Sequence, residues 1–393
     1  MCRINKVWIM DKNTNEHKLF WKGLVWLLSP FVKNRLSFEG ELFDVEGPCL
    51  VVANHVTTWD ALVMATSFPN TPVHYVASEH LFRHGFLSFL LEYFLAPIAR
   101  RKASTAADTV MKCLRRLKAG QVVALFAEGE ACWDGVSIDV FPATGKMART
   151  SGASLVTYRL EGGYPTVPRW TKKIRRGKMR GRIVGVYSPA ELKKMKPEEI
   201  NALINRDIYE NAWDRQKKEH VKFRAKNLAE RIECGFFICP KCEGIGGIKG
   251  VGDHVTCSCG LDLLYTEECF LEPAEPFETL RDWDIWQKEK FKAMDFEAGA
   301  LMFSDEGLKL KEIDAGHGEK LLGSGTLRQY PDAIECAGQR FEYADIGHMS
   351  MVKMKILLFS VGDKYYEIRS KGDICLRKYL AAWDRYAAQN KEK

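Results

Sequence analysis

A histidine and an aspartate lie five residues apart at the end of a short apolar run. The run Cys49–Ala53 reads as a buried strand, His55 follows it, and Asp60 stands at the start of a helical pattern. Ligands and catalytic groups collect at the C-terminal ends of strands in α/β sheets. A histidine that accepts a proton near neutral pH needs an acceptor on its second ring nitrogen, which Asp60 would supply. These residues predict a general-base pair.

The same residues have a second interpretation. Thr57 and Asp60 fit a capping box, in which Asp60 is an ordinary first-turn acid of a helix over Trp59–Ser67 and His55 is a satisfied core histidine. On these residues alone, both interpretations stay open.

Four of the twelve cysteines form two close pairs. Two residues separate Cys239 from Cys242, and fourteen residues lie between Cys242 and the pair Cys257 and Cys259. Two such pairs on tight turns supply four thiolates to a tetrahedral ion, as in a zinc ribbon, with iron the less favoured occupant. Since protein fills all four positions, the site is predicted to be structural; the competing interpretation is a set of unrelated core thiols. The alternative ligands are Cys234, Cys269 and His254.

Further motifs extend the pattern around His55. Asn54, His55 and Asp60 form Asn-His-x4-Asp, which resembles the first motif of the glycerolipid acyltransferase family, the lysophosphatidate acyltransferase group. Phe126–Glu130 is similar to that family's Phe-Pro-Glu-Gly-Thr motif. Pro97–Arg100 falls where the family places a phosphate-contacting arginine, and Leu155–Leu160 where its last apolar block lies. The resemblance covers about residues 20–187, nearly half of the chain.

The resemblance implies an αβα acyltransferase domain of phospholipid biosynthesis, similar to a 1-acylglycerol-3-phosphate O-acyltransferase. Such an enzyme moves a fatty acyl group from a thioester, on coenzyme A or acyl carrier protein, to a hydroxyl of a lysophospholipid-like acceptor. His55 would be the general base and Asp60 would orient it. The implied substrate-binding residues are Arg100, which would hold the acceptor phosphate with help from Arg101 and Lys102, and Glu128 and Gly129, which would shape the acceptor site.

Two positions depart from the family pattern. Glu130 and Ala131 stand where the family has Thr and Arg, so a basic residue is missing and an acid has been added. A carboxylate beside a phosphate costs energy unless a cation lies between them. Either a cation compensates or the acceptor is not a simple lysophosphatidate. The candidate cations are Lys146, Arg159 and Arg169.

Positive charge is concentrated in one segment. The chain carries 58 Lys and Arg against 51 Asp and Glu, a net charge of +7, and Arg169–Arg182 holds eight basic residues in fourteen with no acid. Such a run is typical of a solvated loop. Beside an acyltransferase site it would also suit anionic headgroups or carrier phosphates, and Trp170 within it favours membrane contact.

Two apolar segments are predicted to contact a bilayer surface. The first includes Leu19–Trp21 and Leu24–Leu28 with Lys18, Lys22, Lys33 and Arg35 beside it, and the second is Leu81–Tyr93. Both suit interfacial helices, and packing in the core is the alternative. No run reaches the ~18 apolar residues that a membrane-spanning helix needs.

The N-terminal residues Met1–Phe20 contain no apolar stretch of the secretory type, so a reducing compartment is expected and the cysteines are thiols or metal ligands. The expected location is the cytoplasm, peripherally bound to the cytoplasmic face of a membrane with anionic lipids.

At ~100–200 residues per domain, a chain of 393 residues is expected to form two or three domains, which must position these groups. Strand and helix patterns alternate over 1–196, which predicts an α/β acyltransferase domain with an N-terminal interfacial helix. Residues 197–233 are predicted to be one connecting helix, and 234–268 the zinc ribbon. Residues 269–393 combine a linker helix with short strands and a closing helix, a β-rich domain that resembles the PH/GRAM-like fold in order of elements.

An apolar fraction of 46% with 28% charged residues excludes a collagenous or mainly disordered chain. Two other functions compete with an acyltransferase. One is a catalytically inactive lipid-binding protein; the other is a nucleic-acid-binding zinc-ribbon protein, which is disfavoured because the basic run lies outside the ribbon.

Overall fold

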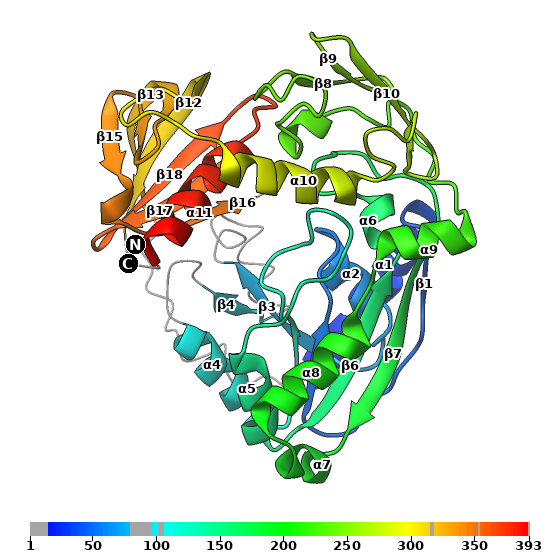
Figure 1. The fold of residues 1–393 in the computed structure, drawn as a ribbon. Helices are drawn as coiled ribbons and strands as arrows, with labels where there is room; N and C mark the ends of the chain where they lie inside the picture. The colour runs from blue at the N-terminus through cyan, green and yellow to red at the C-terminus, as the bar shows by residue number, and fades with distance from the viewer. Residues whose placement is uncertain (1–14, 79–95, 101–105, 315–317, 353, 392–393) are drawn as a thin grey trace. The chain divides into compact units, whose positions relative to one another are not determined.

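The computed structural model describes residues 15–78, 96–100, 106–314, 318–352 and 354–391 (Figure 1). The chain forms two compact units. The first contains Met1–Arg169 and Lys173–Arg224; the second contains Trp170–Lys172 and Ala225–Lys393. The segment 170–172 therefore belongs to a different unit from the residues on either side of it.

The first unit is built on a seven-stranded sheet in the order β1-β7-β6-β2-β5-β3-β4. Strands β2 to β6 run parallel, whereas β7 is antiparallel to β6. Central strands buried on both faces need nearly continuous apolar sequence, and every residue of β2 is buried. The strands are β1 (Phe38–Gly40), β2 (Cys49–Ala53), β3 (Val73–Ser78), β4 (Ile98–Arg100), β5 (Val122–Phe126), β6 (Ser154–Glu161) and β7 (Met179–Tyr187).

Helices pack against this sheet, and the α/β class predicted from the sequence is confirmed (Figure 1). Alternate residues of β2, Leu50 and Val52, form one core with Met147 of α5 and Ile204 of α8. Among the described residues, the helices of this unit are α1 (Asn15–Arg35), α2 (Asp60–Ala65), α4 (Ala106–Lys118), α5 (Ala143–Ser151), α6 (Gly163–Thr166), α7 (Pro189–Lys194), α8 (Pro197–Ile208) and α9 (Ala212–Glu219).

The prediction of one connecting helix over 197–233 is wrong. Helix α8 ends at Ile208 because Tyr209 is extended, and α9 ends before His220, which has a left-handed backbone. In the rest of the predicted range the only helical residues belong to a single 3-10 turn over Ile232–Cys234. Helix α8 buries an apolar stripe with a four-residue spacing, Ile200, Ile204 and Ile208, in the core of the first unit. It is therefore a layer of that unit and not a connector.

The second unit contains two antiparallel sheets and two long helices. The smaller sheet has the order β11-β10-β9-β8, and the larger one the order β15-β14-β13-β12-β18-β17-β16, which confirms the β-rich prediction for the C-terminal part. The smaller sheet consists of β8 (Ile248–Val251), β9 (His254–Cys257), β10 (Leu261–Tyr265) and β11 (Leu271–Glu272). The larger consists of β12 (Phe303–Ile313), β13 (Glu319–Gln329), β14 (Ala333–Cys336), β15 (Gln339–Glu342), β16 (Ile346–Val352), β17 (Ile356–Val361) and β18 (Lys364–Ser370); the helices are α10 (Leu280–Ala293) and α11 (Arg377–Lys391).

Candidate functional site

His55 and Asp60 lie in the connection between β2 and α2. The Nδ1 atom of His55 is 2.7 Å from Oδ2 of Asp60. The buried Asp60 carboxylate also accepts hydrogen bonds from the backbone amides of Val56 and Thr57 and from the Thr57 hydroxyl, at 2.7 to 3.0 Å. With Nδ1 held by a carboxylate, the imidazole presents Nε2, and a quarter of the His55 side chain is exposed. Asp60 therefore both stabilises the turn between β2 and α2 and orients the imidazole of His55.

Three further contacts fix His55. Its ring stacks on Phe126 with centroids 4.8 Å apart. Its backbone amide donates to Oε1 of Glu128 at 3.1 Å, and its carbonyl accepts from the amide of Cys132 at 2.9 Å. The histidine is thus bound on both backbone atoms by the segment that follows β5.

Glu128 is buried and faces the backbone. Besides the His55 amide, its carboxylate accepts the amide of Ile138 at 3.3 Å. Burial raises the pKa of Glu128 to about 8, and the carboxylates of Asp60 and Glu130 act in the same direction, although the two backbone hydrogen bonds oppose it. The family resemblance implies that Glu128 shapes the acceptor site; in the structure its carboxylate binds the backbone amides of His55 and Ile138.

Gly129 has the left-handed backbone that favours glycine, with φ of +82°, and a Cβ there would lie 2.3 Å from the Phe141 ring. The same ring lies under the Arg100 guanidinium, 5.2 Å from its centroid. Gly129 therefore lets the chain approach the aromatic residue on which Arg100 rests.

Arg100 is the last residue of β4. It lies at the end of the sheet where the parallel strands β2 and β5 also have their C-termini. With neighbouring strands ~4.8 Å apart, the three-strand separation puts it roughly 14 Å from the end of β2. Burial lowers the pKa of its guanidinium, and within the described ranges it forms no salt bridge. Arg101 and Lys102, expected to assist it, lie outside the described residues.

Arg169 is the cation that compensates the added acid. Its Nη1 lies 2.7 Å from Oε2 of Glu130 and also donates to the carbonyl of Ala131 at 2.7 Å. Its guanidinium covers the Trp133 ring at 3.7 Å. Of the other two candidates, Lys146 is exposed, and Arg159 lies beside Glu161 with its Nε 3.8 Å from that carboxylate.

The basic segment 169–182 is only partly a solvated loop, since its residues from Met179 onward belong to β7. Trp170 and Arg175 are buried, so the expectation that Trp170 contacts a membrane is wrong. Acids neutralise several of the other charges: Arg180 pairs with Glu219 at 3.0 Å, and Arg182 with Glu161 at 2.7 Å. Arg176 and Lys178 remain exposed.

Helix α1 has two apolar faces. Trp21, Val25 and Val32 are buried. The exposed large side chains are Leu19, Trp26 (78%), Leu27 (66%) and Phe31. The second apolar segment, Leu81–Tyr93, lies outside the described residues. Among the helices that the structure describes, none is long and apolar enough to cross a membrane.

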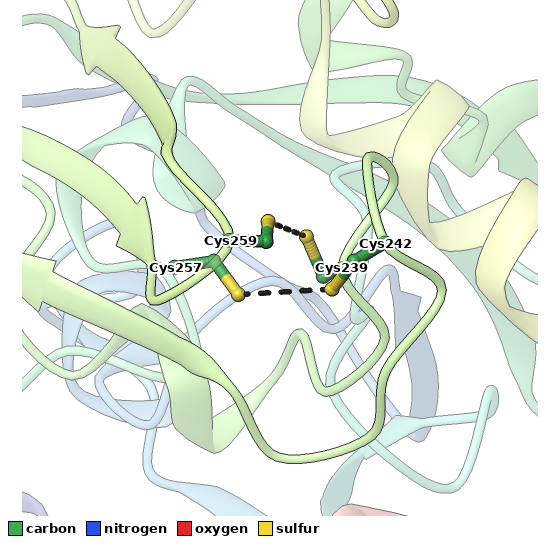
Figure 2. Close-up of side chains that lie close together, drawn as sticks. All are labelled: Cys239, Cys242, Cys257 and Cys259. Carbon is green, nitrogen blue, oxygen red and sulfur yellow. Dashed lines mark hydrogen bonds between the residues drawn. The ribbon is translucent and has the colours of Figure 1, made fainter.

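The four predicted cysteines converge in the second unit (Figure 2). Cys239 and Cys242 come from the chain before β8, Cys257 is the last residue of β9, and Cys259 lies in the turn between β9 and β10. All four sulfurs lie within 4.8 Å of one another, with Cys239 to Cys259 at 3.6 Å and Cys242 to Cys257 at 4.0 Å. A tetrahedral zinc ion with Zn–S of ~2.3 Å would set sulfurs roughly 3.8 Å apart, so the cluster fits this ion. The alternative ligands Cys234, Cys269 and His254 are not part of the cluster.

Comparison with known proteins adds the following. The model of the acyltransferase family matches residues 35–171. Among solved structures, the 1-acyl-sn-glycerophosphate (LPA) acyltransferase PlsC from Thermotoga maritima is similar, with 17% identity, a TM-score of 0.41, and coverage of 49% of this chain and 82% of that one. A chain of the 8S snRNP assembly intermediate aligns with 13% identity, a TM-score of 0.19, and coverage of 23% and 84%. Among curated proteins, no sequence matches.

Proposed function

We propose that this protein transfers a fatty acyl group from a thioester to a hydroxyl of a lysophospholipid-like acceptor, since residues 35–171 match the model of the acyltransferase family. The observation that carries the proposal is the His55 and Asp60 pair, which lies inside the matched segment with Nδ1 held at 2.7 Å. The donor is acyl-CoA or acyl carrier protein.

The proposed step uses His55 as a general base. Nε2 takes the proton of the acceptor hydroxyl while its oxygen attacks the thioester carbonyl. The tetrahedral intermediate then expels the thiolate, which receives that proton from the imidazolium, so an ester and a free thiol are formed. The Asp60 carboxylate stabilises the imidazolium, and general-base catalysis of this kind contributes ~10²–10⁴-fold.

For the acceptor, we propose that Arg100 binds a phosphate. Three features of the Arg100 guanidinium support this role: it is partly buried, it lies against the Phe141 ring, and it pairs with no acid among the described residues. The contacts of Glu128 favour a positioning role in place of direct acceptor binding, whereas Gly129 still shapes the loop. A glycerophosphate-type acceptor matches this arrangement.

We further propose peripheral binding to the cytoplasmic face of a membrane that contains anionic lipids, through α1. Its exposed side chains Leu19, Trp26 and Leu27 stand beside basic residues, a combination that suits the interfacial region of a bilayer. The basic residues are Lys18, Lys22, Lys33 and Arg35.

For the second unit we propose a structural zinc ribbon and a PH/GRAM-like domain. When bound, zinc would cross-link the two cysteine turns, and since four thiolates fill its coordination it would offer no position to a substrate. The seven antiparallel strands β12 to β18 followed by helix α11 support the PH/GRAM-like assignment.

The test is thioester-dependent acylation of a lysophospholipid panel by the wild type, His55→Ala and His254→Ala. His254 pairs with an exposed aspartate in the second unit, so it is a matched control. We expect His55→Ala to lose ~10²-fold or more activity and His254→Ala to keep it. A loss of less than about tenfold in His55→Ala contradicts the general-base assignment.

Two other results would favour the competing functions. Lipid binding without turnover by the wild type would indicate a catalytically inactive lipid-binding protein. DNA or RNA binding that weakens steeply with salt and survives His55→Ala would indicate a nucleic-acid-binding protein.

A further inference from the structure

The segment that binds His55 is itself held by one arginine. Cys132 donates its amide to the His55 carbonyl, and Glu128 accepts the His55 amide. Between these two contacts lie Glu130 and Ala131, and Arg169 binds both, through the Glu130 carboxylate and the Ala131 carbonyl. The loop that fixes both backbone atoms of the histidine is therefore fastened from 39 residues further along the chain.

The position of Arg169 is fixed on its own C-terminal side. Trp170 is fully buried in the second unit, where its ring packs edge-on against Tyr265 at 5.9 Å. Its carbonyl accepts a hydrogen bond from Arg231 at 3.0 Å. The chain continues through Lys172, which pairs with Asp373 at 3.0 Å. Arg169 is thus the last residue of the first unit before a short segment that is anchored in the second.

We propose that Arg169 is a positioning residue for His55, and that Trp170 fixes Arg169 from within the second unit. The guanidinium makes an ion pair, a hydrogen bond to a carbonyl and a stacking contact on Trp133 at once. This combination needs a planar group with several donors, so a lysine at this position reproduces the charge only. Arg169 touches no substrate; it acts through Glu130, Ala131 and Cys132.

Hydrogen exchange at the Cys132 amide tests the loop directly. We expect Arg169→Ala to accelerate this exchange at least about tenfold, because the loop then opens locally, with Arg169→Lys between the variant and the wild type. Arg176→Ala is the matched control, since Arg176 is an exposed arginine of the same basic segment, and it should leave the exchange unchanged. Unchanged exchange in Arg169→Ala overturns the proposal.

The kinetic consequence rests on the proposed acyltransferase function. Arg169→Ala should lower kcat about tenfold or more and leave KM for the thioester within about twofold, since a positioning residue for His55 acts on the chemical step and not on donor binding. An increase of KM with kcat intact overturns positioning. If the wild type transfers no acyl group, the proposed function fails, while the exchange measurement still decides the role of Arg169.

The anchor is tested from the second unit by Tyr265→Leu, which removes the ring packed on Trp170. Faster exchange at the Cys132 amide than in the wild type supports the anchor. Wild-type exchange in Tyr265→Leu, together with faster exchange in Arg169→Ala, overturns the role of Trp170. Trp170→Phe, a milder change, should fall between Tyr265→Leu and the wild type and guards against loss of folding.

Discussion

The side chain of Asn54 pairs with both backbone groups of Leu160, donating to its carbonyl at 2.9 Å and accepting its amide at 2.7 Å. Both residues are fully buried, so this pair ties the end of β2 to the end of β6 one residue before His55. We expect Asn54→Ala to lower the free energy of unfolding by about 2–4 kcal/mol, because two buried backbone groups lose their partners. Urea unfolding measures it. Asn70→Ala, which removes an exposed hydrogen bond to Asp44, should change stability by less than about 0.5 kcal/mol.

Glu128 should make stability depend on pH. Its pKa is about 8 in the folded chain against 4.5 for an ordinary glutamate, because it is buried. The folded state therefore holds a proton that the unfolded state releases, so this contribution is complete below about pH 4.5 and is lost as pH rises through about 8. Glu128→Gln, which cannot ionise, should flatten the dependence of the urea midpoint over this window. The exposed Glu46→Gln should retain it, and an unchanged slope in Glu128→Gln would exclude Glu128 as its source.

Alanine variants of Gly129 and Gly120 distinguish the cost of backbone strain from the cost of a steric clash. Both have φ near +80°, at +82° and +77°, but a Cβ on Gly120 meets nothing within 4 Å whereas one on Gly129 meets the Phe141 ring at 2.3 Å. Each alanine variant should lose ~1–2 kcal/mol through its left-handed backbone. Gly129→Ala should lose a further ~1–3 kcal/mol from overpacking, together with activity. Equal unfolding free energies for the two variants would contradict the contact with Phe141.

The cysteine cluster should bind one zinc ion per chain. Cys242→Ser should lower the zinc content of the purified protein, and a chelator should lower the melting temperature of the wild type, because the ion binds the folded state only. Elemental analysis and thermal unfolding measure the two effects. Cys336→Ser, which changes a buried cysteine outside the cluster, should keep the metal even if stability falls.

Helix α1 should bind anionic vesicles. Replacing both Trp26 and Leu27 by serine should weaken binding to such vesicles, measured by sedimentation, at least about tenfold. Moving each large apolar side chain out of water is favourable by ~1.5–3 kcal/mol of free energy. Leu42→Ser is the control, since Leu42 is 70% exposed in the same unit but outside α1. Equal binding by the wild type and the double variant would place membrane contact elsewhere.

Much of the scaffold can be predicted from residue order alone. The run Cys49–Ala53 is predicted with the same bounds that β2 has, because continuous apolar sequence between polar residues is typical of a buried parallel strand. The spacing of the four cysteines likewise predicts the cluster, since each short turn holds its two sulfurs close together.

Two other elements, helix α8 and strand β16, have a residue pattern in the sequence that could have predicted them correctly. The four-residue spacing of Ile200, Ile204 and Ile208 indicates a buried helix face and could have excluded a connector. Strand β16 was not predicted, although Met349 and Met351 alternate with polar neighbours as a strand requires.

The contacts of the candidate site could not be predicted, because they depend on side-chain direction across long sequence distances. Glu128 was expected in the acceptor site, yet its carboxylate accepts the backbone amide of His55. Arg169 was one of three candidate cations, and the sequence does not distinguish it from the other two as the partner of Glu130. Trp170 packs against Tyr265, which belongs to the same unit but lies much further along the chain. The residue pattern around Trp170 does not indicate a partner so distant in the sequence.

Residues 170–172 belong to the second unit, and this has a consequence for the order in which the chain folds during synthesis. The ribosome releases the strands of the first sheet and helix α8 before it releases Tyr265 and Asp373, and domains generally begin to fold from the N-terminus as they emerge. Trp170 then has no Tyr265 to pack against, and Lys172 has no Asp373. The loop around His55 therefore acquires its final support only when translation has passed the ribbon and the last strands, so a chain halted near Arg224 would carry the sheet complete and its histidine loosely held.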